Sequence, residues 1–151
     1  MKHAAFAAAL AVVLAAGAAH AQSGQRSADY QTQVRGYLDT QAGKHTSEGF
    51  RRDGAIQDFI APMRLEGGAI WPVTLQRGVT YRVFAVCDND CSDVDLEVYD
   101  VGGGFVGRDI ATNDTPYVQI TPQADGVVYA RLWLAACESE PCYVGARVFR
   151  R

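Results

Sequence analysis

The sequence predicts an all-β protein, an antiparallel β-sandwich or jelly roll of about eight strands that follows a signal peptide and one short helix. Three observations support this prediction. After Gly49, short apolar runs recur about every ten residues, separated by residues that favour turns. In the clearest run, apolar and polar residues alternate, as in a strand with one buried face. Four cysteines lie in two closely spaced pairs, which is typical of exported domains.

The first 21 residues have the three parts of a secretory signal peptide. Met1-Lys2-His3 is a basic start, an apolar run covers residues 4–19, and Ala19-His20-Ala21 supplies the small residues of a cleavage site. The apolar run is rich in alanine and interrupted by Gly17, so it is too short and too weakly apolar to span a hydrocarbon core of ~30 Å. A retained membrane anchor is the alternative. We expect a periplasmic or secreted mature chain without a membrane span.

Residues 22–49 are polar and contain one amphipathic stretch. Within residues 28–41, Tyr30, Val34, Tyr37 and Leu38 recur at helical spacing, which predicts a short helix. A loop is expected over residues 44–49, and the sandwich domain over residues 50–151.

Eight strands are expected in that domain. Alternation is clearest over Asp93–Tyr99, so only one side of this strand belongs to the core. Trp71 precedes a proline, which predicts an edge strand or bulge because proline cannot donate to a central ladder. The expected strands are Gln57–Leu65, Ala69–Leu75, Thr80–Cys87, Val94–Tyr99, Gly104–Ile110, Tyr117–Thr121, Val127–Ala136 and Cys142–Arg150.

The cysteines predict two disulfide bonds. An even number of cysteines in an exported chain indicates oxidation, and four cysteines allow three pairings. We favour Cys87–Cys91 and Cys137–Cys142, because each pair brackets a polar segment that reads as a turn. A zinc site is the less favoured interpretation, since the intervening residues are rich in carboxylates.

Negative charge is concentrated in one part of the chain. Residues 87–126 contain nine acidic side chains and a single basic one, Arg108. Such a region repels nucleic acid and anionic lipid, and it attracts cations or a basic partner. We therefore expect no nucleic-acid binding.

The acidic segment after Cys87 is a candidate calcium site. Calcium takes six to eight oxygen ligands, and a turn closed by a disulfide would present several carboxylates at little ordering cost. Asp88, Asp90, Asp93 and Asp95 are the candidate ligands from this segment. An EF-hand is excluded, because a loop starting at Asp88 lacks the required glycine and final glutamate. The alternative is a solvated acidic turn followed by the polar face of a strand.

A family resemblance is visible from this segment onward. Residues 93–100 form a D-x-D-L-x-V-Y-D strand, which a glycine turn at 102–104 joins to a return strand with Val106, Arg108 and Asp109. The run 121–126 followed by residues 127–132 adds a second similarity. Over roughly residues 55–150 the chain resembles bacterial pre-peptidase C-terminal domains.

The resemblance implies a secreted β-sandwich module of a kind that often accompanies proteases and in some members binds calcium or matrix polymers. Asp93, Asp95 and Asp109 are the calcium candidates that match the family pattern. Within these 151 residues we expect no peptidase domain beside the module, and the two cysteine pairs are not part of the usual pattern. The implied protein is a stand-alone relative that contains disulfides.

Residue types offer little for catalysis. After residue 21 the only histidine is His45, in the polar N-terminal segment, and no serine lies in a G-x-S-x-G motif. Oxidised cysteines supply no thiolate. A small secreted hydrolase is therefore the third hypothesis for function, and we expect no enzyme.

A second candidate surface lies on the strand over residues 127–137. Its alternation places Tyr129, Arg131 and Trp133 on the side opposite to four aliphatic residues, which we expect in the core. This ladder would bind a sugar or a partner peptide. Ordinary cross-strand pairing, with Arg131 over an aromatic ring, is the alternative.

These observations favour a non-catalytic binding or accessory module. Calcium is its candidate cofactor, if the acidic turn binds a metal ion. Its expected partner is an extracellular or envelope protein, or a polysaccharide. A structural or envelope-associated protein without a small ligand is the main alternative.

Overall fold

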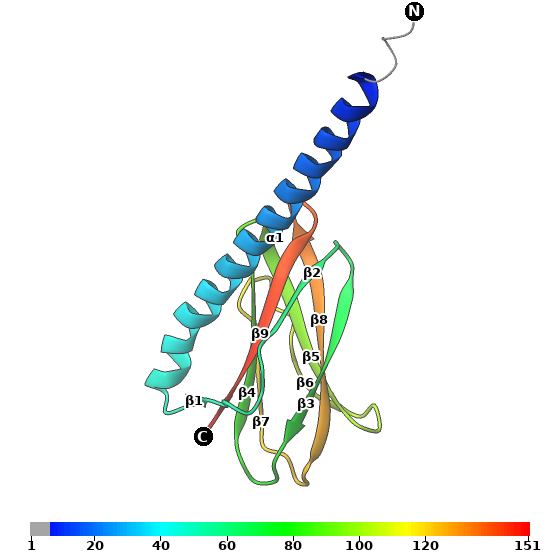
Figure 1. Cartoon of the computed structure of the whole chain (residues 1–151). Helices are drawn as coiled ribbons and strands as arrows, with labels where there is room; N and C mark the ends of the chain where they lie inside the picture. The colour runs from blue at the N-terminus through cyan, green and yellow to red at the C-terminus, as the bar shows by residue number, and fades with distance from the viewer. Residues whose placement is uncertain (1–6) are drawn as a thin grey trace, which may run out of the picture.

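The computed structural model describes the backbone of residues 7–151 and the side chains of residues 24–151. Two antiparallel sheets stack face to face, and one helix covers one of them (Figure 1). The expected all-β sandwich with an N-terminal helix is confirmed. The described elements are α1 (Ala7–Ser47), β1 (Arg51–Arg52), β2 (Phe59–Met63), β3 (Gly68–Leu75), β4 (Tyr81–Cys87), β5 (Cys91–Asp100), β6 (Phe105–Asp109), β7 (Tyr117–Ile120), β8 (Gly126–Cys137) and β9 (Cys142–Arg150).

The two sheets enclose the main hydrophobic core. Sheet A has the order β1-β9-β4-β7, with β2 also paired to β9, and sheet B has the order β3-β8-β5-β6. In β5 the predicted alternation is present, because Val94, Leu96 and Val98 are fully buried between the sheets. Trp71 lies on β3, an edge strand of sheet B, as its following proline predicted.

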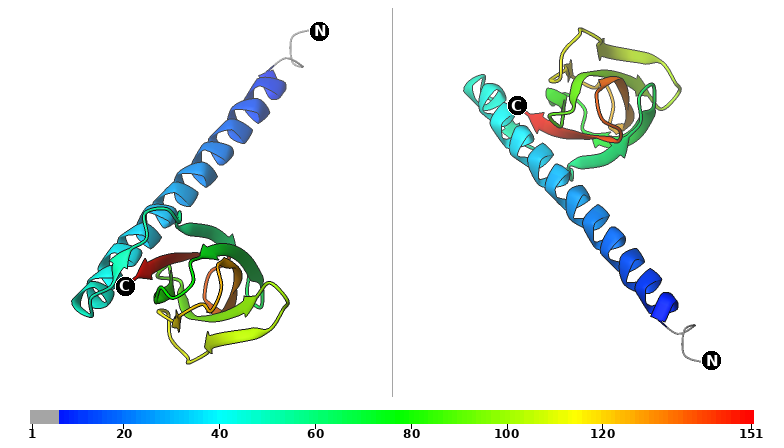
Figure 2. Two further views of the ribbon diagram at one scale, coloured as in Figure 1. Left: turned by 90° about the horizontal axis from the view of Figure 1, so that it is seen from below. Right: turned by 90° about the horizontal axis from the view of Figure 1, so that it is seen from above.

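The helix α1 packs across the outer face of sheet A, against β9 and β4 (Figures 1 and 2). A second apolar layer therefore lies between helix and sheet, and Val34 and Leu38 are its fully buried helical members. Phe84 and Phe149 meet them from the sheet. This layer explains why β4 is buried at every position, whereas β5 is buried only on alternate residues.

The helix is longer than the sequence pattern indicated. It begins at Ala7 and ends at Ser47, so it includes most of the segment expected to be a loop. Residues 7–21 of α1 belong to the predicted signal peptide, and residues 1–6 lie outside the described range. The apolar spacing revealed only the stretch that packs on sheet A, and within it Tyr37 is exposed.

Strand boundaries agree closely with the expected ones, and one strand was missed. Each of the eight expected strands is present with shifts of a few residues at its ends. The additional strand is β1, which pairs Arg51 and Arg52 with β9. Two exposed arginines carry no alternating pattern, so periodicity could not reveal this strand.

Both disulfides have the local pairing that the sequence favoured, and each joins one sheet to the other. Cys87 of β4 is bonded to Cys91 of β5, with Cα atoms 5.8 Å apart. Cys137 of β8 is bonded to Cys142 of β9, with Cα atoms 6.1 Å apart. Since Cys91 and Cys137 are register partners, the two bonds lie side by side at one end of the sandwich. Disulfides of this kind fit a periplasmic or secreted protein.

Within the described residues, no helical stretch combines the length and the hydrophobicity that a membrane span requires.

A glycine permits the close approach of α1 to β9. A Cβ atom at Gly145 would lie 2.4 Å from Cγ1 of Val34 and 3.2 Å from Cδ1 of Leu38. A side chain at this position would therefore overlap Val34, and either the Val34 side chain or the helix would have to shift.

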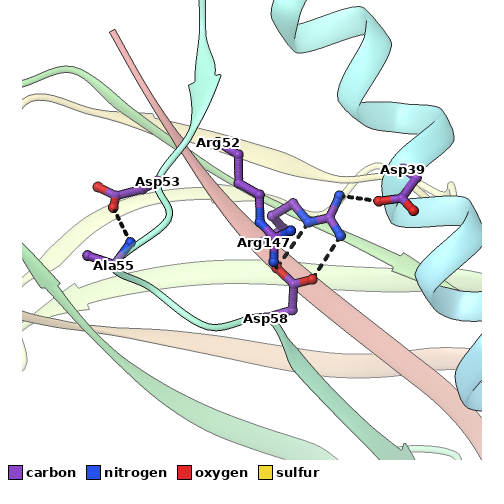
Figure 3. A network of polar contacts seen from close by, with 6 residues as sticks. All are labelled: Asp39, Arg52, Asp53, Ala55, Asp58 and Arg147. Atoms are coloured by element: carbon purple, nitrogen blue, oxygen red, sulfur yellow. Dashed lines mark hydrogen bonds and ion pairs between the residues drawn. The ribbon is translucent and has the colours of Figure 1, made fainter.

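An ion-pair network around the buried Arg147 and Asp58 ties the same face of β9 to three other segments (Figure 3). Arg147 donates two hydrogen bonds to Asp58, at 3.0 and 2.8 Å, and a third to Asp39 of α1 at 2.7 Å. Arg52 of β1 lies 3.1 Å from the same Asp58 carboxylate. Burial opposes the charge of Arg147, but the hydrogen bonds to Asp58 and Asp39 outweigh it and raise the pKa of the guanidinium.

We expect Gly145→Ala to lower the free energy of unfolding by about 1–3 kcal/mol, because the new methyl group overlaps Val34. Urea denaturation measures the loss. Gly126→Ala is the matched control in a strand, since its Cβ would meet no atom within 4 Å. Equal stability of Gly145→Ala and the wild type would show that α1 does not dock as described.

We expect Asp58→Asn to cost about 3 kcal/mol of stability, because it leaves a buried guanidinium incompletely compensated. Asp39→Asn should cost clearly less, since the side chain of Asp39 is 71% exposed and that of Asp58 only 6%. Urea denaturation of both variants tests the order of the two losses, and the reverse order would contradict it.

Candidate functional site

The outer face of sheet B is the broad face that α1 leaves open. Figure 2 shows α1 along β9 on one side of the sandwich, with β6 on the opposite side. We call this surface the open face. The side chains that the strand alternation directs to it are Ile70 and Pro72 of β3, Tyr129, Arg131 and Trp133 of β8, Asp95, Glu97 and Tyr99 of β5, and Phe105 and Arg108 of β6.

The structure orients the predicted ladder of β8 outward. Ala130, Leu132 and Leu134 are fully buried, whereas Tyr129 and Trp133 remain partly exposed. Alternation forces this division, because the aliphatic set fills the core between the sheets.

Arg131 is the centre of this ladder. Its guanidinium lies 4.7 Å from the centroid of the Trp133 ring and forms an ion pair with Glu97 of β5. Glu97 also accepts a hydrogen bond of 3.1 Å from the hydroxyl of Tyr99. The arginine–aromatic pairing that the sequence offered as an alternative is therefore present, and it holds the aromatic side chains in place.

The acidic row of β5 is incompletely neutralised. Arg131 compensates Glu97, but no ion pair joins Asp95 to a basic side chain in the described part of the chain. Burial raises the pKa of Asp95, and the neighbouring carboxylates of Asp93 and Glu97 raise it further, against the opposing effect of Arg131. The open face thus presents aromatic rings beside the carboxylate of Asp95, which has no ion-pair partner within residues 24–151, on a surface with two acidic and two basic side chains.

The predicted calcium ligands occupy separate places. Asp88 and Asp90 lie in the Cys87–Cys91 turn beside α1, where Asp88 accepts the N–H of Tyr143 at 2.6 Å and Asp90 accepts the hydroxyl of Tyr30 at 2.8 Å. These bonds use carboxylate oxygens that a metal ion would need.

The other candidates hold backbone groups of the loop between β6 and β7. Asp93 accepts the N–H of Asn113 at 3.3 Å, and Asp109 accepts those of Ala111 and Tyr117. Across residues 24–151, no three histidine, cysteine or acidic side chains are grouped in a way that would hold a metal ion. The structure therefore does not assemble the five carboxylates, Asp95 included, into one calcium site.

His45 lies at the junction of α1 and sheet A and is 7% exposed. Its ring packs at 4.4 Å on Phe84 and also contacts Tyr117, and its Nδ1 atom lies 3.4 Å from Arg82. Arg82 in turn forms an ion pair with Glu48. The imidazole is thus packed among aromatic rings beside a guanidinium.

A pocket of about 380 Å³ lies between α1, the Cys87–Cys91 turn and the loop before β7. The sequence did not reveal the residues of α1 that line this pocket. Tyr37 was expected to pack on the domain with the other apolar residues of the helix, and Thr40 belongs to no motif. The polar and aromatic residues that line the pocket are Tyr37, Thr40, Gln41, Asp88, Asn89, Asp114 and Thr115.

No family model matches the chain, and no curated protein is similar to it in sequence. Among solved structures, the chain is similar to the crystal structure of Aeromonas hydrophila PliG, a periplasmic lysozyme inhibitor of g-type lysozyme. The match has a TM-score of 0.46 and 12% sequence identity, and it covers 63% of this chain and 85% of that chain. A likeness at this level carries no argument about function. The resemblance to pre-peptidase C-terminal domains stays a prediction.

The burial of His45 predicts a loss of stability at acidic pH. Burial lowers the pKa of His45 below its usual 6.5, and the neighbouring Arg82 lowers it further. The unfolded chain therefore binds a proton first as the pH falls, so the stability due to neutral His45 is complete above about pH 6.5 and declines below it. Urea midpoints at about pH 7.5 and 5.5 should differ more for the wild type than for His45→Gln. Identical pH dependence of the two proteins would contradict this expectation.

Proposed function

We propose that the protein is a periplasmic or secreted, non-catalytic binding module that takes a basic protein partner on the open face. The observation that supports this most is the juxtaposition of the Tyr129–Arg131–Trp133 ladder with the incompletely neutralised row of β5.

The apolar part of the open face suits a protein partner. The few residues that dominate the binding energy of protein interfaces are enriched in tyrosine, tryptophan and arginine, and here one of each lies on a single strand. Ile70 is 57% exposed on the neighbouring β3, and Phe105 is 60% exposed on β6. Burial of these side chains by a partner would remove apolar surface from water.

The charge of the face determines which partner it favours. Asp95 lies beside the carboxylates of Asp93 and Glu97, which Arg131 offsets only in part, and Arg108 of β6 is the register partner of Glu97 rather than of Asp95. A cationic surface would relieve this repulsion and would be attracted over a distance, whereas an acidic partner or nucleic acid would be repelled.

The test uses defined probes and isothermal titration calorimetry. The basic probe is a twelve-residue peptide of alternating lysine and tyrosine, with a glutamate–tyrosine peptide as its charge-reversed counterpart and a neutral hexasaccharide as the glycan probe. We expect the protein to bind the basic peptide and neither of the other two probes. Its affinity for the basic peptide should fall at least about tenfold between roughly 20 and 300 mM salt.

Two substitutions locate that binding on the open face. Asp95→Asn removes a negative charge and Trp133→Ala removes an aromatic ring. Each substitution should lower the affinity for the basic peptide at least about threefold. Glu138→Gln is the charge-matched control in an exposed turn away from the ladder. Circular dichroism checks the fold of Trp133→Ala, and Asp95→Asn remains decisive if that variant unfolds.

Three outcomes would overturn the proposal. The first is an absence of binding by the basic peptide, and the second is an equal effect of Glu138→Gln and Asp95→Asn. The third is preferential binding of the hexasaccharide, which would favour a polysaccharide as the partner.

A further inference from the structure

We infer that the pocket between α1 and the Cys87–Cys91 turn is a second binding site, specific for an alkylammonium group. The inference starts from Asp88, whose side chain is nearly inaccessible although it lines a pocket of about 380 Å³. It concerns a different side of the molecule from the open face and does not rest on the proposed function.

One oxygen of Asp88 has no partner. Oδ2 accepts the N–H of Tyr143 at 2.6 Å, whereas Oδ1 is buried without any hydrogen bond. If the carboxyl group is ionised, Oδ1 lacks a donor, and if it is protonated there, the proton lacks an acceptor. Buried polar atoms are rarely left in this state, so a ligand that donates hydrogen bonds would complete the site.

The charge around the pocket favours a cation. Burial raises the pKa of Asp88, and the carboxylate of Asp90 adds to the effect, against hydrogen bonds from the backbone N–H groups of Tyr143 and Asp90 that lower it. Asp114 also lines the pocket, and none of the described lining residues is basic. A bound positive charge would therefore stabilise the ionised form of Asp88.

The remaining walls suit an ammonium group better than a metal ion. An ammonium needs about three acceptors, which Asp88 and the hydroxyl oxygens of Thr40 and Thr115 can supply. Tyr37 adds an aromatic ring, which attracts organic cations. Calcium instead requires six to eight oxygens, with several carboxylates among them, and the described residues contain no such group.

The experiment is a titration of the full ¹⁵N-labelled protein followed by amide chemical shifts. The probe is n-butylammonium chloride, n-butanol is its uncharged counterpart, and calcium chloride is a separate arm. We expect saturable shifts at the amides of Asn89 and Tyr143 with butylammonium and none with butanol.

Substitutions then test the role of the buried carboxyl group. Asp88→Asn keeps an oxygen that accepts the N–H of Tyr143 but loses the negative charge. We expect this substitution to lower the affinity for butylammonium at least about tenfold. Asp114→Asn makes the same charge change at an exposed lining residue and should weaken it less than about threefold. Tyr37→Leu keeps every charge and should weaken it about threefold through loss of the ring.

The inference is overturned if butylammonium gives no saturable shift, if butanol binds equally well, or if Asp88→Asn binds as the wild type does. Saturation by calcium but not by butylammonium would also overturn it and would restore the calcium hypothesis at this turn. Should Asp88→Asn fail to fold, the comparison of Tyr37→Leu with the wild type and the butanol arm decides.

Discussion

The docking of α1 on sheet A is the interaction on which the rest of the structure depends. It requires a strand position without a side chain, because Val34 occupies the space that a Cβ at Gly145 would need. Once the helix is in place, β4 and β9 are buried on both faces and sheet A becomes the middle layer. Sheet B is then left with one face toward the core and one toward solvent, which makes its outer face available for binding.

Charge compensation differs from place to place in the molecule. Where α1 covers β4 and β9, the buried charges of two arginines are paired, as Arg147 is with Asp58 and Arg82 is with Glu48. At the Cys87–Cys91 turn and along β5, the buried Asp88 and the partly buried Asp95 have no ion-pair partner among the described residues, and the pKa of each is raised. Uncompensated carboxylates cost stability unless a ligand offsets them. Both proposed sites lie where this cost is found.

Local hydrophobic patterns predicted the strands well, because the pattern of each strand reflects whether one or both of its faces are buried. The alternation over β5 and β8 follows from a single buried face, and it correctly separated Trp133 from Leu132 and Leu134. The cysteine spacing favoured the observed bonds, since four or five residues are enough to pass from one sheet to the other. The strand β1 and the full length of α1 were missed, because neither has an apolar period of its own.

The sequence by itself determined the fold class, the strand order along the chain, the local disulfides and the location of negative charge. Only the tertiary structure decided how those charges are grouped. Asp88, Asp93 and Asp109 all belong to the acidic part of the chain. Each accepts a hydrogen bond from a different backbone segment, so their carboxylates do not meet at one site. Conversely, Tyr37 and Asp88 share a pocket because α1 crosses sheet A beside the turn. Sequence spacing sets which face of a strand a side chain occupies, whereas contacts between distant segments depend on how the layers pack.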